Sequence, residues 1–528
     1  MTKFLTILSI ISILTSCQKF TKLIDSNYSD RINIKNGSDH VKLLFSHNIN
    51  GETHPCGCRK FPLGGLPQVA GYMSKAKKES SIIYVDTGDM LFQTTNIPPY
   101  YEESMQYTAE KLAEIQHKLN LRVLVPGELD LSLGEGFLKK VTEKNELPLL
   151  IANLSESSKL NAKAWIKYEL GKRTLYLIGI VNPNVFTSPN QNIFTDPKKA
   201  LEESLKEIES DKSKNKTIIL LSHGGMEFDR RIAKTFNQIN WIIGSHSQAF
   251  LRYPEVENKT KIVQVLSRNH YLGLLKIPLN PEKEIKYEQI EVRDELEKEI
   301  KNNPISKWLE SYKTELDKIQ AKEQNKFGNS VSYEETKART YISCSSCHSD
   351  QVDFWNTTAH SLAYQTLIQA KAANNPSCIK CHSVHFNQPN GFAAKSDIIQ
   401  GEELSDEKME KYWQELSNNF KDTGSIRDLK PKKRKELAEK WHKLDNTFKV
   451  EHNFANVQCL NCHDQNNEHP FEESEKSKVN DYTAKCIVCH TSDQSPSWYE
   501  ENKQGLATKL KKKYVEQKIK EVACPKMN

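Results

Sequence analysis

Short apolar runs alternate with amphipathic stretches along the first half of the chain. Apolar runs of strand length occur at residues 41–45, 82–85, 122–125, 149–151, 175–178, 217–221 and 241–243. Between them, residues 102–119 and 198–208 place apolar side chains at helical spacing, and β-like segments follow at 263–277. This alternation of strands and helices predicts an α/β domain over residues 41–293.

The pattern of apolar positions changes beyond residue 293. Residues 294–335 are charged and favour a helix interrupted by Pro304, so we expect a helical connector between two domains. From 336 to 500 strand-like runs are few, which predicts a mostly α or irregular second domain. The lysine-rich segment 501–528 is expected to form a surface helix. A chain of 528 residues is long enough for two or three domains.

The pattern Cys-x-x-Cys-His occurs four times in the last third of the chain. Two thiols at this spacing can form thioethers to the haem vinyl groups, and the next residue presents an imidazole to the iron. Zinc ribbons and disulfides also use paired cysteines, but neither needs a histidine directly after each pair. We therefore expect four covalently bound c-type haems. The motif residues are Cys344, Cys347 and His348; Cys378, Cys381 and His382; Cys459, Cys462 and His463; and Cys486, Cys489 and His490.

Further histidines are available to coordinate the irons from the distal side. They are His360, His385, His442, His452 and His469. Methionine is nearly absent from this region, so coordination by two histidines is favoured over histidine with methionine. Such haems generally have low reduction potentials, and we expect low-potential electron carriers.

Two segments of the second domain support a family comparison. Residues 354–364 contain Trp355 and His360 at the spacing Trp-x4-His, and residues 456–469 surround the third motif. Both resemble the tetrahaem cytochromes of ammonia-oxidising bacteria and their relatives, over roughly residues 341–498. The resemblance implies His360, His452 and His469 as distal ligands.

His385 departs from that family, because relatives often carry glycine at this position after the second motif. This histidine could supply a fourth distal ligand. Alternatively, the second haem is five-coordinate and open to a small molecule.

The first domain carries short motifs that resemble the periplasmic 5′-nucleotidase and metallophosphatase family. Residues 43–51, 63–66 and 85–89 look like its opening, and residues 222–225 and 244–248 look like its two later histidine motifs. The resemblance implies a four-layer α/β sandwich with a two-metal site where loops converge at the strand ends. The residues Asp89, His223 and His246 keep the family's ligand types.

Other ligand positions of that family have changed. The usual Asp-x-His opening reads Asn-Ile-Asn at 48–50, the usual Asn-His-Glu motif reads Pro-Gly-Glu at 126–128, and the last histidine is Gln248. Neutral amides bind divalent metals far more weakly than carboxylates or imidazoles do. A normal dimetal nucleotidase site is therefore not expected.

A second set of possible ligands follows the altered first motif: His54, Cys56 and Cys58. The two thiols could bind a soft or borderline transition metal together with His223 or His246. They could also act as a redox pair or form an inert disulfide. Of the 12 cysteines, eight belong to haem motifs and one is Cys17. The three that remain are Cys56, Cys58 and Cys524.

The first 17 residues resemble a bacterial lipoprotein signal. Lys3 precedes an apolar stretch at 4–14 that is too short to span a bilayer as a helix. Leu-Thr-Ser-Cys at 14–17 resembles a lipobox, which implies lipidation of Cys17, and residues 18–40 are interpreted as a tether. Gln18 favours sorting to the outer membrane, by resemblance to enterobacterial lipoproteins. We expect a lipid-anchored protein of the cell envelope that faces the periplasm or the cell surface.

Charge limits the choice of partners. The net charge is +6, and no basic patch is interleaved with stacking aromatic residues, so a nucleic-acid partner is not expected. The expected partners are the membrane, through the lipid anchor, and redox proteins of the envelope.

The leading interpretation is a membrane-anchored tetrahaem c-type cytochrome that carries electrons and is fused to a degenerate metallophosphatase-like domain. One alternative is an oxidoreductase acting on a small nitrogen or sulfur compound. Another is a metal-dependent phosphoesterase or nucleotidase with rearranged ligands.

Overall fold

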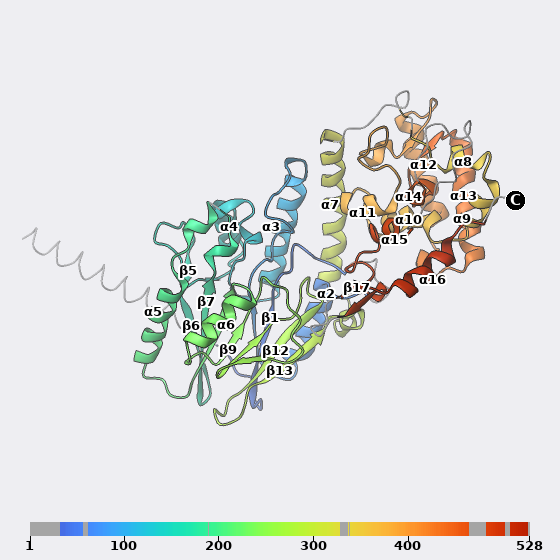
Figure 1. The fold of residues 1–528 in the computed structure, drawn as a ribbon. Coiled ribbons are helices and arrows are strands. Elements are labelled where there is room, and N and C mark those ends of the chain that lie inside the picture. Colours follow the sequence, from blue (N-terminus) through green and yellow to red (C-terminus); the bar gives the residue numbers. More distant parts are fainter. Residues whose placement is uncertain are drawn as a thin grey trace, which may run out of the picture. The chain divides into compact units, whose positions relative to one another are not determined.

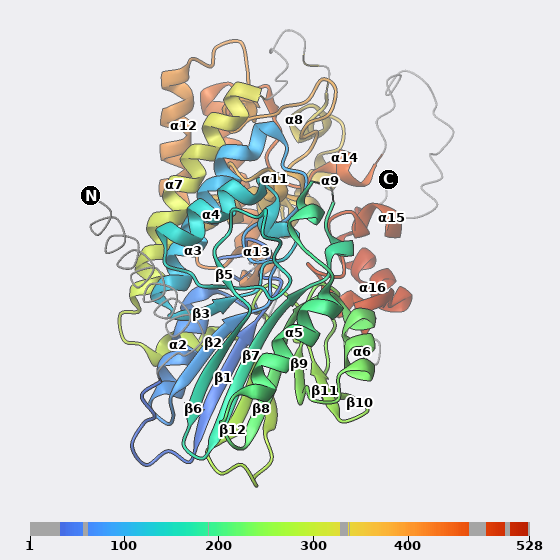
Figure 2. The same cartoon turned by 90° about the vertical axis from the view of Figure 1, so that its left-hand side faces the viewer.

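The structure is a computed structural model that describes residues 32–55, 62–187, 189–327, 336, 338–463, 482–501 and 507–525. The chain forms two compact units, whose largest segments meet in the sequence between Leu309 and Glu310 (Figures 1 and 2). Several predicted site residues lie outside the described residues: Cys17, Cys56, Cys58 and His469. Within the described ranges, no helix combines the length and apolarity needed to cross a bilayer.

The larger sheet of the first unit has seven strands in the order β13-β12-β1-β2-β3-β4-β5. Its strands are β1 (His40–Ser46), β2 (Ile82–Asp86), β3 (Leu121–Leu124), β4 (Leu149–Leu150), β5 (Ala162–Lys163), β12 (Tyr271–Pro278) and β13 (Lys286–Glu291). Strands β1 to β5 are parallel, and β12 and β13 add an antiparallel edge. The first four predicted strands are confirmed as β1 to β4.

The second sheet of this unit has six strands in the order β10-β11-β9-β8-β7-β6. Its strands are β6 (Trp165–Leu170), β7 (Arg173–Val181), β8 (Lys216–His223), β9 (Trp241–Ile243), β10 (Glu255–Glu257) and β11 (Thr260–Val263). Strands β7, β8, β9 and β11 are parallel, with β6 and β10 antiparallel at the two edges. The other three predicted strands are confirmed as β7 to β9.

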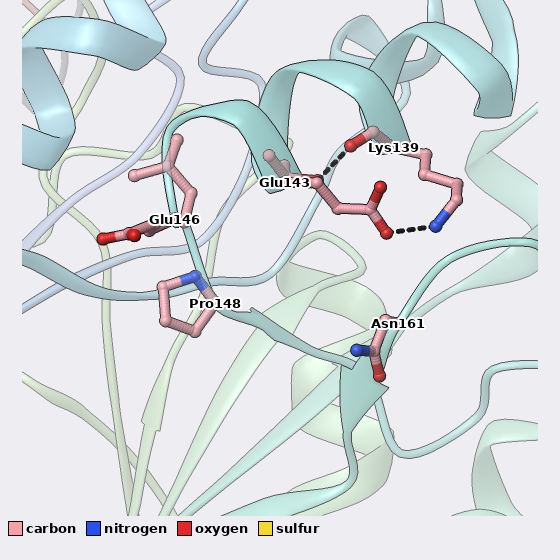
Figure 3. A pocket seen from close by; sticks show the side chains of 7 residues that line it. Lys139, Glu143, Glu146, Pro148 and Asn161 are labelled. Atoms are coloured by element: carbon pink, nitrogen blue, oxygen red, sulfur yellow. Dashed lines mark hydrogen bonds and ion pairs between the residues drawn. The ribbon is translucent and has the colours of Figure 1, made fainter.

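Helices of the first unit lie against both sheets. The helices α3 (Glu102–Lys118) and α5 (Pro197–Ser210) confirm the two predicted helices. Helix α2 (Leu66–Lys77) was not predicted, because its first eight positions are all buried and it lacks a polar face there. Helix α4 (Gly134–Lys144) ends beside a surface pocket that contains an ion pair between Lys139 and Glu143 (Figure 3).

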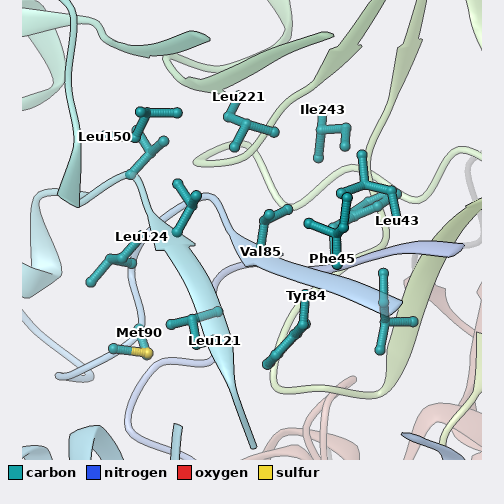
Figure 4. Packing of buried hydrophobic residues seen from close by; sticks show 14 of the residues in the cluster. Leu43, Phe45, Tyr84, Val85, Met90, Leu121, Leu124, Leu150, Leu221 and Ile243 are labelled. Carbon is teal, nitrogen blue, oxygen red and sulfur yellow. The ribbon is translucent and has the colours of Figure 1, made fainter. Parts of the chain in front are cut away.

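The sheets pack face to face over an aliphatic core. Val85 of β2 points towards Leu221 of β8 and Ile243 of β9, whereas Tyr84 points the opposite way (Figure 4). On β7 the neighbouring positions alternate in the same manner. Leu177 belongs to the core between the sheets, and Tyr176 belongs to a second cluster with α5 and α6 (Met226–Thr235). The first unit is thus a four-layer α/β sandwich, as predicted.

Helix α7 (Pro304–Phe327) begins at the proline that was expected to interrupt it. Proline is well tolerated in the first turn of a helix, where its missing N–H has no intrahelical partner to lose. The charged segment before it forms a short 3-10 helix, Asp294–Glu299. Pro304 therefore starts the long helix.

The second unit is mostly helical, as expected. Its helices are α8 (Tyr341–Ser345), α9 (Ser349–Trp355), α10 (Ala363–Ala370), α11 (Pro376–His382), α12 (Asp406–Asn419), α13 (Pro431–Phe448), α14 (Cys459–Cys462), α15 (Tyr482–Ile487) and α16 (Lys512–Val522). Two small strand pairs join them: β14 (Ile399–Gln400) with β15 (His452–Asn453), and β16 (Tyr499–Glu501) with β17 (Ala507–Leu510). The lysine-rich end was expected to be helical throughout, but a strand, β17, precedes α16.

A buried carboxylate holds the helices of the second unit together. Asp445 of α13 accepts hydrogen bonds from the hydroxyls of Tyr341 and Tyr412 and from the side-chain amide of Asn453. Burial raises the pKa of Asp445 to about 6. Trp441 donates to the Tyr412 hydroxyl at 2.7 Å, which extends the network. Asp445 therefore links α8 to α12, α13 and β15.

Candidate functional site

Four side chains with metal-binding groups gather at strand ends in the first unit. Asp89 follows β2 and Glu128 follows β3, whereas His223 ends β8 and His246 follows β9. The carboxyl ends of parallel strands share one edge of a sheet, where loops commonly form ligand sites. Because the two sheets pack face to face, loops from both sheets supply this cluster.

The cluster is compact. One ligand atom from each of the four residues lies within 4.8 Å of the others, an arrangement that could hold a metal ion. Glu128 contacts His223 Nε2 through Oε2 at 2.6 Å and His246 Nδ1 through Oε1 at 2.7 Å. Asp89 Oδ1 lies 3.6 Å from His223 Nε2. Two carboxylates and two imidazoles suit a borderline divalent cation such as zinc.

Neighbouring groups orient the histidine at the centre of the cluster. His223 is fully buried, and its Nδ1 donates to the carbonyl oxygen of Thr87 at 2.8 Å, so Nε2 faces the two carboxylates. A hydrogen bond of this kind fixes the ring of a metal-binding histidine.

The charges in the cluster compensate one another. Burial alone would lower the pKa of His223, but Asp89 and Glu128 raise it to about 10. Burial would raise the pKa of Glu128, but hydrogen bonds from both histidines hold that pKa below its usual range. The pKa of Asp89 is raised to about 7, chiefly by burial. The two carboxylates therefore stabilise a positive charge at this point, which is carried by His223.

The backbone around the cluster is unusual. Asp89 and His246 adopt left-handed conformations, with φ of 60° and 69°, and Asn48 and Asn50 do so as well. Such conformations in residues other than glycine cost energy and often occur at functional sites. Gly127 allows close approach, because a Cβ there would lie 2.3 Å from Asp89 Oδ1.

Two positions that differ from the family's metal ligands, Asn48 and Asn50, carry side-chain amides beside the cluster. Asn48 donates through Nδ2 to Asp89 Oδ2 at 2.8 Å and accepts from the backbone N–H of His246 through Oδ1 at 3.2 Å. Asn50 Oδ1 is buried and, among the described residues, has no hydrogen-bond partner. The structure brings Asp89, His223 and His246 together, as the resemblance implied.

Glu128 is the member of the cluster that sequence reasoning did not identify as a ligand. It was noted only as the last residue of Pro-Gly-Glu, which stands where the family has Asn-His-Glu. A carboxylate in the loop that follows a buried strand, within an altered family motif, was the available signal. The sequence-predicted thiols Cys56 and Cys58 remain untested, because they lie outside the described residues.

In the second unit the haem-binding motifs lie on short helices. Cys344 is on α8, Cys378 and Cys381 on α11, Cys459 and Cys462 on α14, and Cys486 on α15. A helical turn places the two thiols of a motif on one side. None of the eight motif cysteines is joined in a disulfide.

The motifs lie close to one another in pairs. The thiols of Cys344 and Cys459 interact, which places the first motif beside the third. Cys381 and Cys489 interact in the same way, which places the second motif beside the fourth.

Two of the proximal histidines are oriented for metal binding. His382 Nδ1 donates to the carbonyl oxygen of Ala363 at 2.6 Å. His490 Nδ1 lies 2.9 Å from the Ser495 hydroxyl, and its ring stacks on Trp498 with centroids 4.3 Å apart. Contacts through Nδ1 leave Nε2 available to an iron. These residues therefore fit c-type haem.

The predicted distal histidines occupy different surroundings. The rings of His360 and His490 have centroids 6.4 Å apart, and burial lowers the pKa of His360 to about 4, so this imidazole is neutral at pH 7. His385 and His452 both lie beside Phe454, each with a centroid distance of 6.2 Å. His442 stacks on Tyr341 instead, at 4.4 Å.

Comparison with known proteins places a cytochrome region in the second unit. Residues 343–403, which contain the first two Cys-x-x-Cys-His motifs, match the family described as Cytochrome c554 and c-prime. A cytochrome c domain implies covalently bound haem.

The first unit is similar to a different class of proteins. Human 5′-nucleotidase is 25% identical over 248 residues, which cover 41% of this chain and 41% of the human protein. The chain thus spans about two fifths of the length of that relative.

Two solved structures from Thermus thermophilus match in part. A 5′-nucleotidase precursor has a TM-score of 0.44, 21% identity and coverage of 52% of this chain and 58% of that one. A sulfate thiohydrolase has a TM-score of 0.45, 16% identity and coverage of 53% and 61%.

Proposed function

We propose that this chain, in which a multihaem cytochrome region is joined to a 5′-nucleotidase-like region, carries electrons through four c-type haems in the cell envelope. The observation that carries the proposal is the pairwise proximity of the four Cys-x-x-Cys-His motifs, first with third and second with fourth. Haems attached at these points would lie near one another, as a chain of electron carriers requires.

His360 and His490 are the best-supported axial pair. Metal–imidazole bonds are about 2 Å long, so two rings that share one ion have centroids roughly 6 Å apart. Their observed separation of 6.4 Å matches this expectation. A haem held by two histidines supplies reversible one-electron transfer and has no open position for a substrate.

The surroundings of His385 support a carrier rather than an enzyme. Its Nε2 is buried and, within the described part of the chain, makes no hydrogen bond. A buried imidazole nitrogen of this kind is suited to bind an iron. A fourth distal histidine would close the position that an oxidoreductase needs for its substrate.

The fourth motif offers a contact point for a redox partner. Val488, between the two cysteines, is 69% exposed, and Ile487 beside it is also exposed. The helix α16, which packs against α15, adds the lysines Lys512 and Lys513. An apolar spot bordered by positive charge suits a partner with an acidic surface.

Lipidation of Cys17, which would anchor the chain to the outer membrane, belongs to the same proposal.

Optical and EPR spectra of the full chain, matured in a host that attaches c-type haem, test the function. We expect four low-spin haems per chain and no binding of carbon monoxide after reduction. His360→Ala should convert one haem to a high-spin form that binds carbon monoxide, whereas the exposed control His117→Ala should change nothing. A wild-type protein that binds carbon monoxide stoichiometrically would contradict the carrier and favour the oxidoreductase.

A further inference from the structure

We infer that the cluster in the first unit binds one borderline divalent cation, such as zinc, through Asp89, Glu128, His223 and His246. The resemblance to metallophosphatases implies two cations, and the residues of this chain fit only one of them. The proposal concerns the first unit alone and does not depend on the haems.

The four ligand residues form a complete set for one ion. Their ligand atoms come from two carboxylates and two imidazoles that lie within 4.8 Å of one another. Glu128 faces both histidines at 2.6 and 2.7 Å, so an ion among them would be close to three of the four residues at once. Four ligands of these types are typical of a tetrahedral zinc site.

Asn48 takes the place of the second cation. Its side-chain amide donates to Asp89 Oδ2, the carboxylate oxygen that faces away from His223. An N–H group at 2.8 Å from this oxygen occupies the space that a bridged second cation needs. The Asn48 oxygen is also engaged, because it accepts from the backbone N–H of His246.

The neighbouring histidine cannot replace the missing ligand. His47 Nε2 accepts a hydrogen bond from the backbone N–H of Val265 at 2.8 Å, and Nδ1 contacts Asn48. Both ring nitrogens are therefore occupied within the fold. The remaining altered positions, Asn50 and Gln248, carry neutral amides, which bind divalent cations weakly.

The charges of the ligands also favour one cation per cluster. As metal ligands, the carboxylates of Asp89 and Glu128 would be deprotonated and together carry two negative charges, which balance one divalent cation. Two such cations would leave two uncompensated positive charges beside the fully buried His223, which is costly in a protein interior. Glu128 thus completes one cation site, while Asn48 removes the other.

Metal content of the full, haem-loaded chain tests the inference. After incubation with zinc and removal of unbound metal, elemental mass spectrometry should give one zinc per chain, with protein concentration measured independently. Glu128→Gln should weaken zinc binding at least tenfold, because it removes a charged ligand. The matched control Glu143→Gln, on the exposed face of α4, should keep one zinc. Zero or two zinc ions in the wild type would overturn the proposal, and so would unchanged binding by Glu128→Gln.

A second variant tests the role of Asn48 by a gain of binding. The triple change Asn48→Asp, Asn50→His and Gln248→His restores the ligand types that the family uses. We expect the zinc content to rise from one to two per chain. A triple variant that attaches its haems normally but still binds one zinc would overturn the assignment of Asn48 as the group that excludes the second cation.

Discussion

The two units differ in how their sites are encoded. In the second unit each haem-binding motif is five consecutive residues on or beside a short helix, such as Cys378 to His382 on α11. In the first unit the ligand cluster is assembled from the end of one strand and the loops that follow three others, between Asp89 and His246 in the sequence. A contiguous motif contains all of its haem-binding residues within one short segment. A dispersed site can change one ligand at a time while the sandwich around it stays intact.

The difference also appears in the cores. The first unit is held by aliphatic side chains between two sheets, such as Val85 and Leu221. The second unit contains a buried polar network around Asp445, with aromatic neighbours. Substitutions can therefore damage either unit selectively.

The largest effect should come from removing a haem-binding motif. Cys459→Ser with Cys462→Ser abolishes both thioether bonds of the third motif, so haem content should fall from four to three per chain. Absorbance of the pyridine haemochrome, relative to protein concentration, measures this loss. Cys524→Ser is the control, because this exposed thiol belongs to no motif and four haems should remain. Loss of a haem in the control would show that Cys524 takes part in haem attachment.

Loss of the buried carboxylate should strongly destabilise the second unit. Asp445→Ala leaves three donors without their acceptor, from Tyr341, Tyr412 and Asn453. We expect the free energy of unfolding to fall by about 3–5 kcal/mol. Denaturation followed by the haem absorbance should report the change, while the zinc content of the first unit stays the same.

The same carboxylate predicts a dependence on pH. Burial raises the pKa of Asp445 from 3.8 to about 6, so the folded state favours the protonated form. Its stabilising contribution is complete below about pH 4 and is lost as the pH rises through about 6. Comparison of wild type with Asp445→Asn across this window isolates the contribution. If the free energies of unfolding of the two proteins change in parallel with pH, the raised pKa of Asp445 is contradicted.

A cavity in the aliphatic core should affect only the first unit. Leu221→Ala, between the sheets, should lower the free energy of unfolding of that unit by about 2–5 kcal/mol. Circular dichroism of the sheets should report the loss, with haem spectra unchanged. The conservative change Leu221→Met should cost less than about 1.5 kcal/mol. A simultaneous shift of both signals would show that the units unfold together.

The smallest effect is expected at the partner surface. Val488→Asp places a negative charge where an acidic partner would bind, and the coupling of one exposed charge is about 0.2–1 kcal/mol. Rates of electron transfer to acidic acceptor proteins should fall by about twofold to fivefold, and the fall should diminish at high salt. Val256→Asp, at an exposed site in the first unit, should leave these rates unchanged. Faster transfer in Val488→Asp would contradict an acidic partner.

Much of the first fold followed from the sequence, because buried strands such as β8 are continuous apolar runs. The unpredicted α2 is buried on most sides and lacks the helical period by which the amphipathic α3 was found. Pro304 was predicted to interrupt a helix, but it begins α7. A proline can mark either the end of a helix or its first turn. A helix can be recognised from its local pattern only when one of its faces is polar.

The sites were predictable to different degrees. All four haem motifs were visible, since their spacing is local. Glu128 was missed because its role depends on His223, 95 residues later, and no local pattern links the two. The proximity of the His360 and His490 rings is likewise a property of the fold.

The bond between Tyr341 and Asp445 also imposes an order in time. The two residues are 104 positions apart, so Tyr341 leaves the ribosome before its acceptor does. Until α13 follows, α8 lacks this anchor and the adjacent Cys344 lies in an unfinished region. The network of Tyr341 and Tyr412 therefore lacks its common acceptor until Asp445 has been synthesised.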